Sequence, residues 1–365
     1  MNRAEVMHIV PALFGYEGVY GGAERYALEL ARAMAERVPT TLIAYGAVPM
    51  SRREGPLQIE VLRNWIPYRR FRFDPFSPSL ALRLSRAKFV HYHQTHTLMA
   101  GITALIGQVT GRPVFTTHLG GGGVGFHRLT DTTNWFAGHL HISRFSMKAF
   151  GHADLPCARV IGGGVDFRIF HPGERPPTRD FILFAGRLLP HKGIDYLIQA
   201  MPTEVPLVIA GRPWLHALGF YRRLIPLAEG KRITFLEQCS DADLVELYRN
   251  ARCIVLPSVY RTSTGEEYAI PELLGQTLLE GMACRTPGIA TDVGAMPEVV
   301  EHGVSGFVVP PNDTDALCSA ILTLWHDATL TERMGEAALQ RTQEQFDWSR
   351  VVDRCLDAYY REGAK

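Results

Sequence analysis

The chain has 365 residues, of which 46% are hydrophobic and 21% are charged. This ordinary globular composition excludes a disordered or collagen-like chain, and at about 150 residues per domain the length predicts two domains. The 38 Lys and Arg residues nearly balance the 37 Asp and Glu residues, and the net charge of +1 argues against a nucleic-acid partner.

Neither the cysteines nor the first apolar run indicates secretion. The six cysteines form no CxxC pair, so no disulfide framework or zinc knuckle is predicted, and reduced thiols in a cytoplasm are expected. The apolar run at residues 6–14 has about half the length that spans a bilayer, and Arg3 alone precedes it. A cytoplasmic protein is expected.

Short apolar runs alternate with segments of helical periodicity along the chain. Strands are predicted at residues 6–10, 40–45, 89–92, 113–117, 181–185, 206–210 and 253–257, and helices at residues 22–37, after Gly193 and after Trp348. Repetition of strand, helix and strand is typical of parallel α/β sheets. The fold class expected is α/β, with two Rossmann-like domains.

A proline-rich, charged segment at residues 171–180 separates the two groups of strands. We therefore expect an N-terminal domain over residues 1–165 and a second domain over residues 175–345. The last helix, in residues 346–365, is expected to cross back to the first domain. The two domains would face each other across a cleft, with the ligand at the carboxyl ends of the strands.

Each domain opens with a glycine-bearing turn between a strand and a helix. Gly21 and Gly22 precede the first helix, where free N–H groups favour a phosphate, although a tight turn explains the pair equally simply. In AGRLLPHKG, Arg187 and Lys192 leave a buried strand and can hold a diphosphate. A solvated basic loop is the alternative for this second turn.

The segment PELLGQTLLEGMA places Glu272 and Glu280 eight positions apart. On a helix this spacing gives about 12 Å of rise on a similar face, near the span of a sugar nucleotide. Gly275, between them at the expected helix entrance, would let backbone amides approach a phosphate. An ordinary amphipathic helix with two glutamates remains the alternative.

Five motifs in order carry a resemblance over nearly the whole chain. They are GGAERYALELARAM, FAGRLLPHKGIDYLIQAMP, FLEQCSDADLVELYRNARCIVLPS, PELLGQTLLEGMACRTPGIATDVGAMPEVVEHGVSGFVVPPND and FDWSRVV. In these motifs the chain resembles the retaining glycosyltransferases of family 4, which have the GT-B fold and an E-x7-E motif. The resemblance implies a two-domain enzyme that uses a nucleotide sugar.

The resemblance also implies roles for individual residues. Glu272 would contact the donor sugar, Glu280 the ribose, and Arg187 with Lys192 the diphosphate. The remaining donor contacts implied are Gly21 and Gly22 at the distal phosphate, the backbone of Gln238 and Cys239 at the nucleobase, and Leu274, Gly275, Gln276 and Thr277 in the motif. His118 would lie beside the reacting face of the sugar, so the catalytic set is His118, Glu272, Arg187 and Lys192.

The chain departs from the family pattern near this motif. Leu273 and Leu274 stand where the family more often has a small residue and Phe, and Glu237 replaces a usual glycine. The segment VYRTSTGEEYAI, residues 259–270, lengthens the approach to Glu272. These departures bear on the donor pocket and on the identity of the sugar, but they leave the fold assignment unchanged.

Two other features can each be interpreted in two ways. Asp241 and Asp243 could be a metal-binding DxD, but they follow Ser240 at a helix start, where capping is expected. His91, His93 and His96 resemble metal ligands, but no carboxylate or cysteine follows at a recognised spacing, so we expect strand-end residues. No metal site is predicted.

The acceptor side is read from weaker signals. His93, Gly121 and Gly122 are the acceptor-binding candidates, with glycines 120–123 forming either a mobile lid or a plain flexible loop. Residues 63–73 interleave arginines with aromatics, which suits either peripheral contact with the inner membrane face or a solvated basic surface.

The sequence thus predicts metal-independent hexosyl transfer, with retention, from a nucleoside diphosphate sugar to a hydroxyl acceptor. The acceptor would be a glycan, a lipid-linked molecule or a small molecule, in polysaccharide or glycoconjugate biosynthesis. No cofactor is expected, and the donor nucleotide is UDP by default with GDP next. Two alternatives remain open: a GT-B nucleotide-sugar 2-epimerase and an inactive sugar-nucleotide binding protein.

Overall fold

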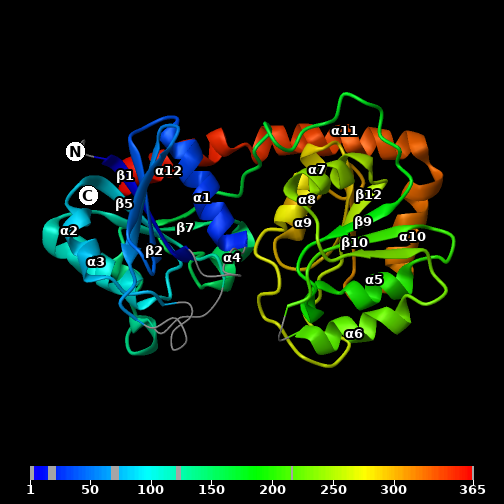
Figure 1. Cartoon of the computed structure of the whole chain (residues 1–365), viewed down its shortest axis with the longest axis horizontal. Coiled ribbons are helices and arrows are strands. Elements are labelled where there is room, and N and C mark those ends of the chain that lie inside the picture. The colour runs from blue at the N-terminus through cyan, green and yellow to red at the C-terminus, as the bar shows by residue number, and fades with distance from the viewer. Residues whose placement is uncertain (1–3, 15–21, 67–73, 121–124, 215–216, 364–365) are drawn as a thin grey trace. The chain divides into compact units, whose positions relative to one another are not determined.

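The computed structural model describes residues 4–14, 22–66, 74–120, 125–214 and 217–363. The chain divides into two compact units, one of Met1–Gly164 with Trp348–Lys365 and one of Val165–Asp347. The division falls at Gly164 and Val165, ahead of the proline-rich segment at residues 171–180. We call these unit 1 and unit 2, and they are coloured along the chain in Figure 1.

Unit 1 is built on an eight-stranded sheet of order β3-β4-β2-β1-β5-β6-β7-β8. Its strands are β1 (Ala4–Phe14), β2 (Thr40–Gly46), β3 (Met50–Glu54), β4 (Leu57–Arg63), β5 (Ala87–His93), β6 (Val114–Thr117), β7 (Gly138–His141) and β8 (Ala158–Val160). All neighbours pair in parallel except β3 and β4, which form an antiparallel hairpin at the edge. The prediction of a parallel sheet therefore needs this one correction, since a short two-residue turn joins β3 to β4.

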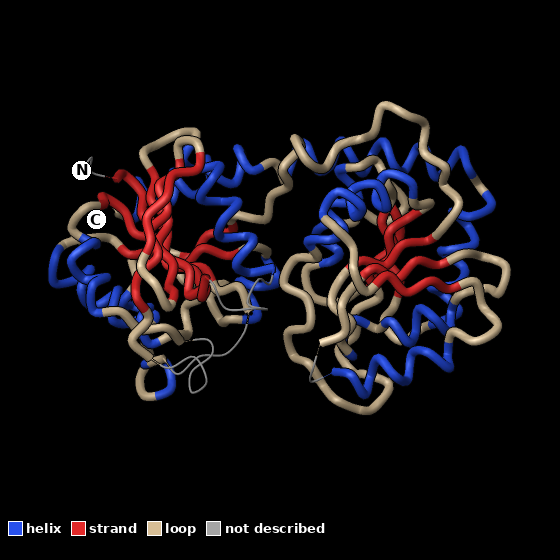
Figure 2. The backbone as a smooth tube through the Cα atoms, in the orientation of Figure 1, coloured by secondary structure: helices blue, strands red, loops and turns tan. Residues whose placement is uncertain are grey.

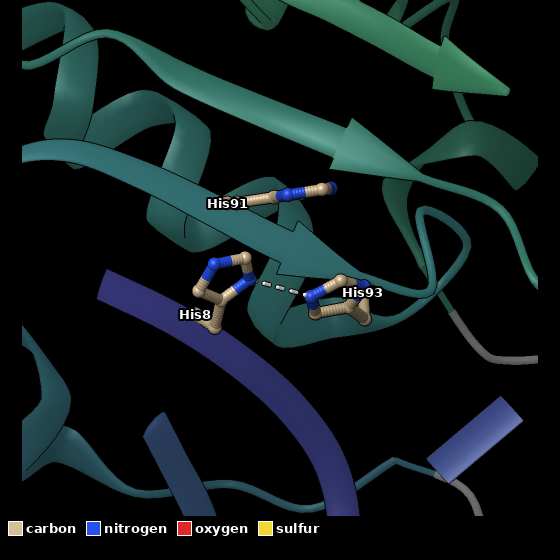
Figure 3. A group of neighbouring side chains, drawn as sticks. All are labelled: His8, His91 and His93. Atoms are coloured by element: carbon tan, nitrogen blue, oxygen red, sulfur yellow. Dashed lines mark hydrogen bonds between the residues drawn. The ribbon is translucent and has the colours of Figure 1, made fainter. Parts of the chain in front are cut away.

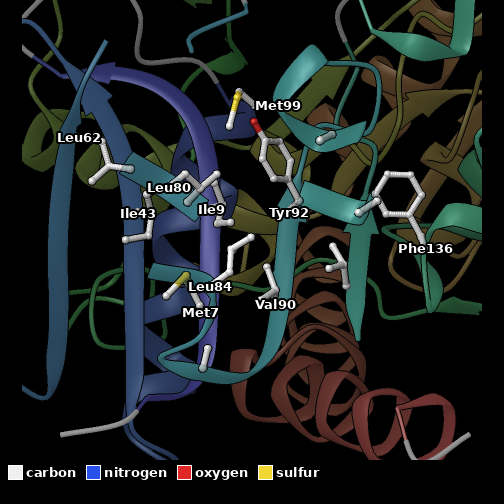
Figure 4. Close-up of a cluster of buried hydrophobic side chains, with 14 of the residues drawn as sticks. Met7, Ile9, Ile43, Leu62, Leu80, Leu84, Val90, Tyr92, Met99 and Phe136 are labelled. Carbon is white, nitrogen blue, oxygen red and sulfur yellow. The ribbon is translucent and has the colours of Figure 1, made fainter. Parts of the chain in front are cut away.

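The helices of unit 1 are α1 (Gly22–Ala35), α2 (Ala81–Leu84), α3 (Leu98–Thr110), α4 (Arg144–Ala149) and α12 (Trp348–Glu362). On one sheet face, Met7, Ile9, Val90 and Tyr92 pack into a buried cluster with residues of α2 and α3 (Figure 4). Because side chains alternate along a strand, Val10 lies on the opposite face, where it packs with Ala27 and other residues of α1.

Helix α12, the last helix of the chain, packs on the same face of this sheet as α1. Its Tyr359 ring stacks on Phe89 of β5, and Arg159 of β8 forms an ion pair with Glu362 at 2.6 Å. The helix is amphipathic, with Val351, Val352 and Cys355 buried among other apolar residues. The predicted helices at residues 22–37 and after Trp348 are confirmed as α1 and α12.

Unit 2 contains a fully parallel six-stranded sheet of order β11-β10-β9-β12-β13-β14. In the backbone view of Figure 2 its strands, drawn in red, lie between helices. Its strands are β9 (Ile182–Ala185), β10 (Leu207–Ala210), β11 (Ile233–Leu236), β12 (Cys253–Leu256), β13 (Gly288–Thr291) and β14 (Gly306–Val309). Its helices are α5 (Ile194–Ala200), α6 (Leu218–Leu227), α7 (Asp241–Asn250), α8 (Gln276–Ala283), α9 (Met296–Val299), α10 (Thr314–His326) and α11 (Ala328–Gln345).

This strand order is the doubly wound Rossmann order, in which the third strand is outermost and the first lies beside the fourth. The order of the strands reverses between β9 and β12, and ligands of such sheets bind beyond the carboxyl ends of the strands at that reversal. Among the described residues, no helix is long and apolar enough to cross a lipid bilayer.

Candidate functional site

The candidate site of unit 2 lies where the loops after β9 and β12 meet. Gly193 has a φ of +65°, and a Cβ there would lie 2.0 Å from the Pro257 carbonyl oxygen. Only glycine therefore permits this approach of the two loops. The backbone N–H of Val259 donates to the His191 carbonyl at 2.9 Å, which fixes the loop of Arg187 and Lys192 against the chain that leaves β12.

Lys192 and Glu272 form an ion pair at this point. The Lys192 ammonium donates to Glu272 Oε2, and the two side chains are only 13% and 12% exposed. Ser258 Oγ also lies 3.5 Å from that oxygen. The sequence assigned Lys192 to the diphosphate and Glu272 to the donor sugar, but no sequence pattern indicates that the two side chains touch. In this pair the two charges neutralise each other. When a ligand with a phosphate and hydroxyl groups binds, the Lys192 ammonium can pair with the phosphate and the Glu272 carboxylate can accept hydrogen bonds from the hydroxyls.

The prediction that Glu272 and Glu280 share one helix is wrong. Helix α8 begins at Gln276, so Glu272 lies in the irregular segment before it. Pro271 disfavours helix in the residue before it, and Gly275 adopts a left-handed φ of +90° immediately before the helix. Gln276 and Thr277 form the first turn of α8, and the positive end of the helix dipole at that turn suits the approach of a phosphate.

Glu280 lies inside α8 and is only 2% exposed. Its Oε2 accepts a hydrogen bond of 2.8 Å from the Tyr248 hydroxyl, which comes from α7. Sequence analysis missed Tyr248, because a tyrosine on the apolar face of a helix is usually core and carries no distinguishing spacing. The hydroxyl thus fixes one carboxylate oxygen of Glu280. Leu274, two residues before α8 begins, is also buried.

The other predicted donor residues lie at the carboxyl edge of the same sheet. Arg187 is exposed after β9, and its guanidinium carbon lies 5.3 Å from the centre of the Trp214 ring. Gln238 and Cys239 follow β11 and retain exposure. Since the carboxyl ends of parallel strands share one edge, the structure brings these residues to the same edge as Lys192.

The capping interpretation of Asp241 and Asp243 is confirmed. Ser240 is the N-cap of α7, and its hydroxyl accepts from the Asp243 N–H at 3.1 Å. The Asp243 carboxylate in turn accepts from the Ser240 N–H and hydroxyl, which completes a capping box.

In unit 1, Gly22 is the exposed first residue of α1, whereas Gly21, Gly121 and Gly122 lie outside the described residues. His118 follows β6 and is 7% exposed. Its ring lies 4.3 Å from that of His96 and edge-on to Phe150. Burial, followed by the neighbouring histidines, lowers the pKa of His118 to about 3, so the imidazole is neutral near pH 7.

His93 is fully buried within unit 1, and its predicted contact with an acceptor gains no support from this position. His93 Nε2 is hydrogen bonded to His8 Nδ1 at 2.9 Å, and Figure 3 shows this pair beside His91. Both nitrogens of His91 have hydroxyl partners, Tyr359 at 2.6 Å and Thr117 at 2.7 Å. One ring nitrogen from each of His8, His91 and His93 lies within 4.8 Å of the others, and burial lowers the pKa of all three rings, so the imidazoles are neutral near pH 7.

Unit 2 is therefore an α/β domain with positive side chains at the carboxyl edge of its sheet, where the strand order reverses. Enzymes that bind sugar nucleotides belong to this class of protein. Comparison with solved structures shows the GT-B fold. The match to HepE from Anabaena in complex with UDP and glucose has a TM-score of 0.73 and 18% identity, and covers 98% of this chain and 100% of that one. The match to a sucrose-phosphate synthase from Thermosynechococcus elongatus has a TM-score of 0.72 and 18% identity, and covers 99% of each chain.

Family models identify the family itself. The model described as "Glycosyltransferase Family 4" matches residues 20–168, and that described as "Glycosyl transferases group 1" matches residues 166–341. The two models together cover residues 20–341, so the chain belongs to glycosyltransferase family 4. This result confirms the resemblance drawn from the sequence motifs.

Curated relatives agree with this assignment. The chain is 32% identical over 225 residues to a D-inositol 3-phosphate glycosyltransferase of Mycolicibacterium gilvum, covering 58% of this chain and 48% of the relative. It is 29% identical over 286 residues to the enzyme of that name from Mycolicibacterium paratuberculosis, covering 74% and 61%. The chain thus spans about half to three fifths of the length of these relatives.

Proposed function

We propose that the protein transfers a hexosyl group from a nucleoside diphosphate sugar to a hydroxyl acceptor, with retention of configuration and without a metal ion. The observation that carries the proposal is the partly buried Lys192–Glu272 pair, with Glu272 just before helix α8. Structural neighbours support the donor class, since HepE has been solved with UDP and with UDP-glucose. UDP is therefore the first nucleotide to test and GDP the second.

The mechanism follows from where charge develops. As the glycosyl phosphate bond breaks, the diphosphate gains negative charge and the sugar becomes cation-like. Arg187, Lys192 and the N–H groups of α8 stabilise the diphosphate, and the Glu272 carboxylate, released from Lys192, accepts hydrogen bonds from the sugar hydroxyls. We assign the acceptor to unit 1, where neutral His118 offers a hydrogen-bonding group and carries no competing positive charge.

Retention is accounted for by attack from the side of the leaving group. The acceptor hydroxyl gives its proton to the departing phosphate, so no carboxylate needs to form a covalent intermediate as in retaining glycosidases. None of the relatives and structures reported above is described as an epimerase, and we do not propose that activity. Contact of unit 1 with a membrane face stays a prediction. Among the described residues of the basic segment at 63–73, Trp65 is 67% exposed and could insert into the membrane surface.

Two measurements test the proposal. A thermal-shift screen with UDP, GDP, ADP and dTDP sugars should identify one stabilising donor, because a ligand that binds the native state raises its apparent stability. NMR of the product formed from that donor should then show the anomeric configuration of the donor. An inverted product would exclude retention, and the absence of stabilisation by any sugar nucleotide would exclude the donor site.

A further inference from the structure

The segment of residues 259–270, which the family pattern does not account for, is an ordered β-hairpin. The Tyr268 N–H donates to the Tyr260 carbonyl at 2.8 Å, and the Thr262 N–H donates to the Glu266 carbonyl at 2.9 Å. Arg261 and Glu267 form an antiparallel bridge between these bonds. Thr262, only 4% exposed, closes the turn, because its hydroxyl accepts from the Glu266 N–H. We call residues 259–270 the insert hairpin.

The insert hairpin is fixed to both loops of the candidate donor site. At its base, the Val259 N–H bonds to the His191 carbonyl. At its first strand, the Tyr260 hydroxyl accepts from the Gly294 N–H at 2.9 Å, and Gly294 packs directly on the Glu272 backbone. The hairpin therefore has a set position relative to Glu272 and Lys192.

Tyr268 places an aromatic ring against His191, next to Lys192 of the candidate donor site. Its ring centre lies 4.7 Å from that of His191, which directly precedes Lys192, and Tyr268 itself precedes Glu272 by four residues. Tyr268 is only partly buried, and Glu266 and Glu267 beside it are exposed. Burial and the neighbouring Lys192 lower the pKa of His191 to about 4, so the ring beneath Tyr268 is neutral near pH 7.

Aromatic rings with adjacent carboxylates suit a carbohydrate. The ring covers the apolar C–H face of a pyranose, and carboxylate oxygens accept hydrogen bonds from its hydroxyls. A nucleobase or diphosphate would gain less here, because the two exposed carboxylates repel phosphate.

We propose that the insert hairpin forms one wall of the donor-sugar subsite, with Tyr268 packing against the hexosyl group and selecting the sugar. This inference rests on the proposed function, since it needs a sugar nucleotide bound at Lys192 and Glu272. It assigns sugar selection to a segment that the E-x7-E motif does not contain.

The test separates sugar binding from nucleotide binding. Dissociation constants of UDP-glucose and UDP, and of GDP-mannose and GDP, are measured by calorimetry for the wild type, Tyr268→Ala, Tyr268→Phe and Ser263→Ala. The last is a matched control at the exposed hairpin tip. For the nucleotide that the wild type prefers, Tyr268→Ala should weaken the sugar nucleotide about fivefold to tenfold and leave the nucleoside diphosphate unchanged. Tyr268→Phe and Ser263→Ala should retain wild-type values.

Three outcomes overturn the inference, and they differ in what else they remove. If Tyr268→Ala weakens the sugar nucleotide and the nucleoside diphosphate equally, Tyr268 acts only through the fold of the loop. If it changes neither constant, the ring does not touch the sugar, and in both cases the proposed function stands. If the wild type binds none of these four ligands and no sugar nucleotide of the thermal-shift screen, the proposed function fails together with the inference.

Discussion

The two units share one α/β design but differ at the carboxyl edges of their sheets. In unit 2 this edge carries charge, with exposed Arg187 and the partly buried Lys192–Glu272 pair. In unit 1 it carries imidazoles, with His118 after β6 and His141 at the end of β7. Both solutions keep an ionisable group out of water, the first by pairing opposite charges and the second by keeping the ring neutral.

The difference predicts different ligands for the two edges. A charged edge suits a diphosphate, and a neutral hydrogen-bonding edge suits a hydroxyl compound that must not be held too tightly by charge. Variants and conditions that alter one edge should therefore produce effects specific to that unit.

The largest effect is expected from Lys192→Ala. The substitution removes the cation proposed for the diphosphate and leaves the partly buried Glu272 carboxylate without Lys192. We expect kcat/KM to fall by roughly 10³ and nucleoside diphosphate binding to weaken at the same time. Arg222→Ala, at an exposed position of α6 in the same unit, is the control and should match the wild type in both calorimetry and steady-state kinetics.

Glu272→Ala should separate turnover from binding. If Glu272 serves the sugar rather than the diphosphate, kcat falls by roughly 10² while the Kd of the nucleoside diphosphate changes little. Release of Lys192 from its carboxylate partner even favours tighter binding of the diphosphate. A parallel loss of nucleotide affinity and kcat would contradict the role assigned to Glu272.

Hydrophobic periodicity predicted seven of the fourteen strands that the structure describes, namely β1, β2, β5, β6, β9, β10 and β12, and two of the missed strands show why it fails. β7 has the sequence GHLH and is fully buried. Because two of its four residues are polar, hydrophobicity does not identify it as a core strand. β3 reads MSRRE and is largely exposed, so it shows no apolar alternation. Periodicity reports burial through apolar residue types, and it fails where a strand is buried with polar side chains or is not buried.

The site was predicted residue by residue but not as contacts. Arg187, Lys192 and Glu272 follow strands, so topology alone brings them to one edge. The Lys192–Glu272 pair and the Tyr248–Glu280 bond join residues 80 and 32 positions apart, and no local pattern encodes such contacts. The burial of His93 against His8 also depends on the pairing of β1 with β5, which spacing within HYHQTH cannot show.

Acid should destabilise unit 1 before unit 2. Burial lowers the pKa of His8, His118 and His141 to about 3, below the unfolded value of 6.5, whereas His191 is the comparable group described in unit 2. The unfolded chain therefore binds more protons, so this stability is complete above pH 6.5 and is lost as the pH falls towards 3. Each such histidine costs up to about 1.4 kcal/mol per pH unit in that window.

Calorimetry can resolve this difference between the units. Between pH 7 and pH 5 we expect the melting transition of unit 1 to move to lower temperature by more than that of unit 2, with hydrogen exchange assigning each transition. Equal shifts of both transitions would show that the buried imidazoles of unit 1 do not control its acid stability.

A smaller effect is expected from Tyr248→Phe. The change removes only the hydroxyl that donates to Glu280 Oε2 and keeps the packing of the ring. If Glu280 serves the ribose, nucleoside diphosphate affinity should fall about fivefold, a loss of about 1 kcal/mol, with kcat nearly unchanged. Tyr360→Phe, which removes a tyrosine–glutamate bond to Glu5 in unit 1, is the control. Wild-type affinity in Tyr248→Phe would limit Tyr248 to a packing role.

The smallest effect is expected from removing metal ions, because unit 2 supplies its own positive charge at the edge proposed for the donor. Arg187 and Lys192 are available to the diphosphate, while the Asp243 carboxylate of the DAD sequence is already used in capping α7. Activity measured in EDTA should therefore equal that of untreated protein, and added Mn²⁺ should not raise it. If activity falls in EDTA and returns with Mn²⁺, Asp241→Asn distinguishes the causes: loss of the Mn²⁺ response would assign the ion to the DAD carboxylates, and an unchanged response would direct attention to other oxygen ligands.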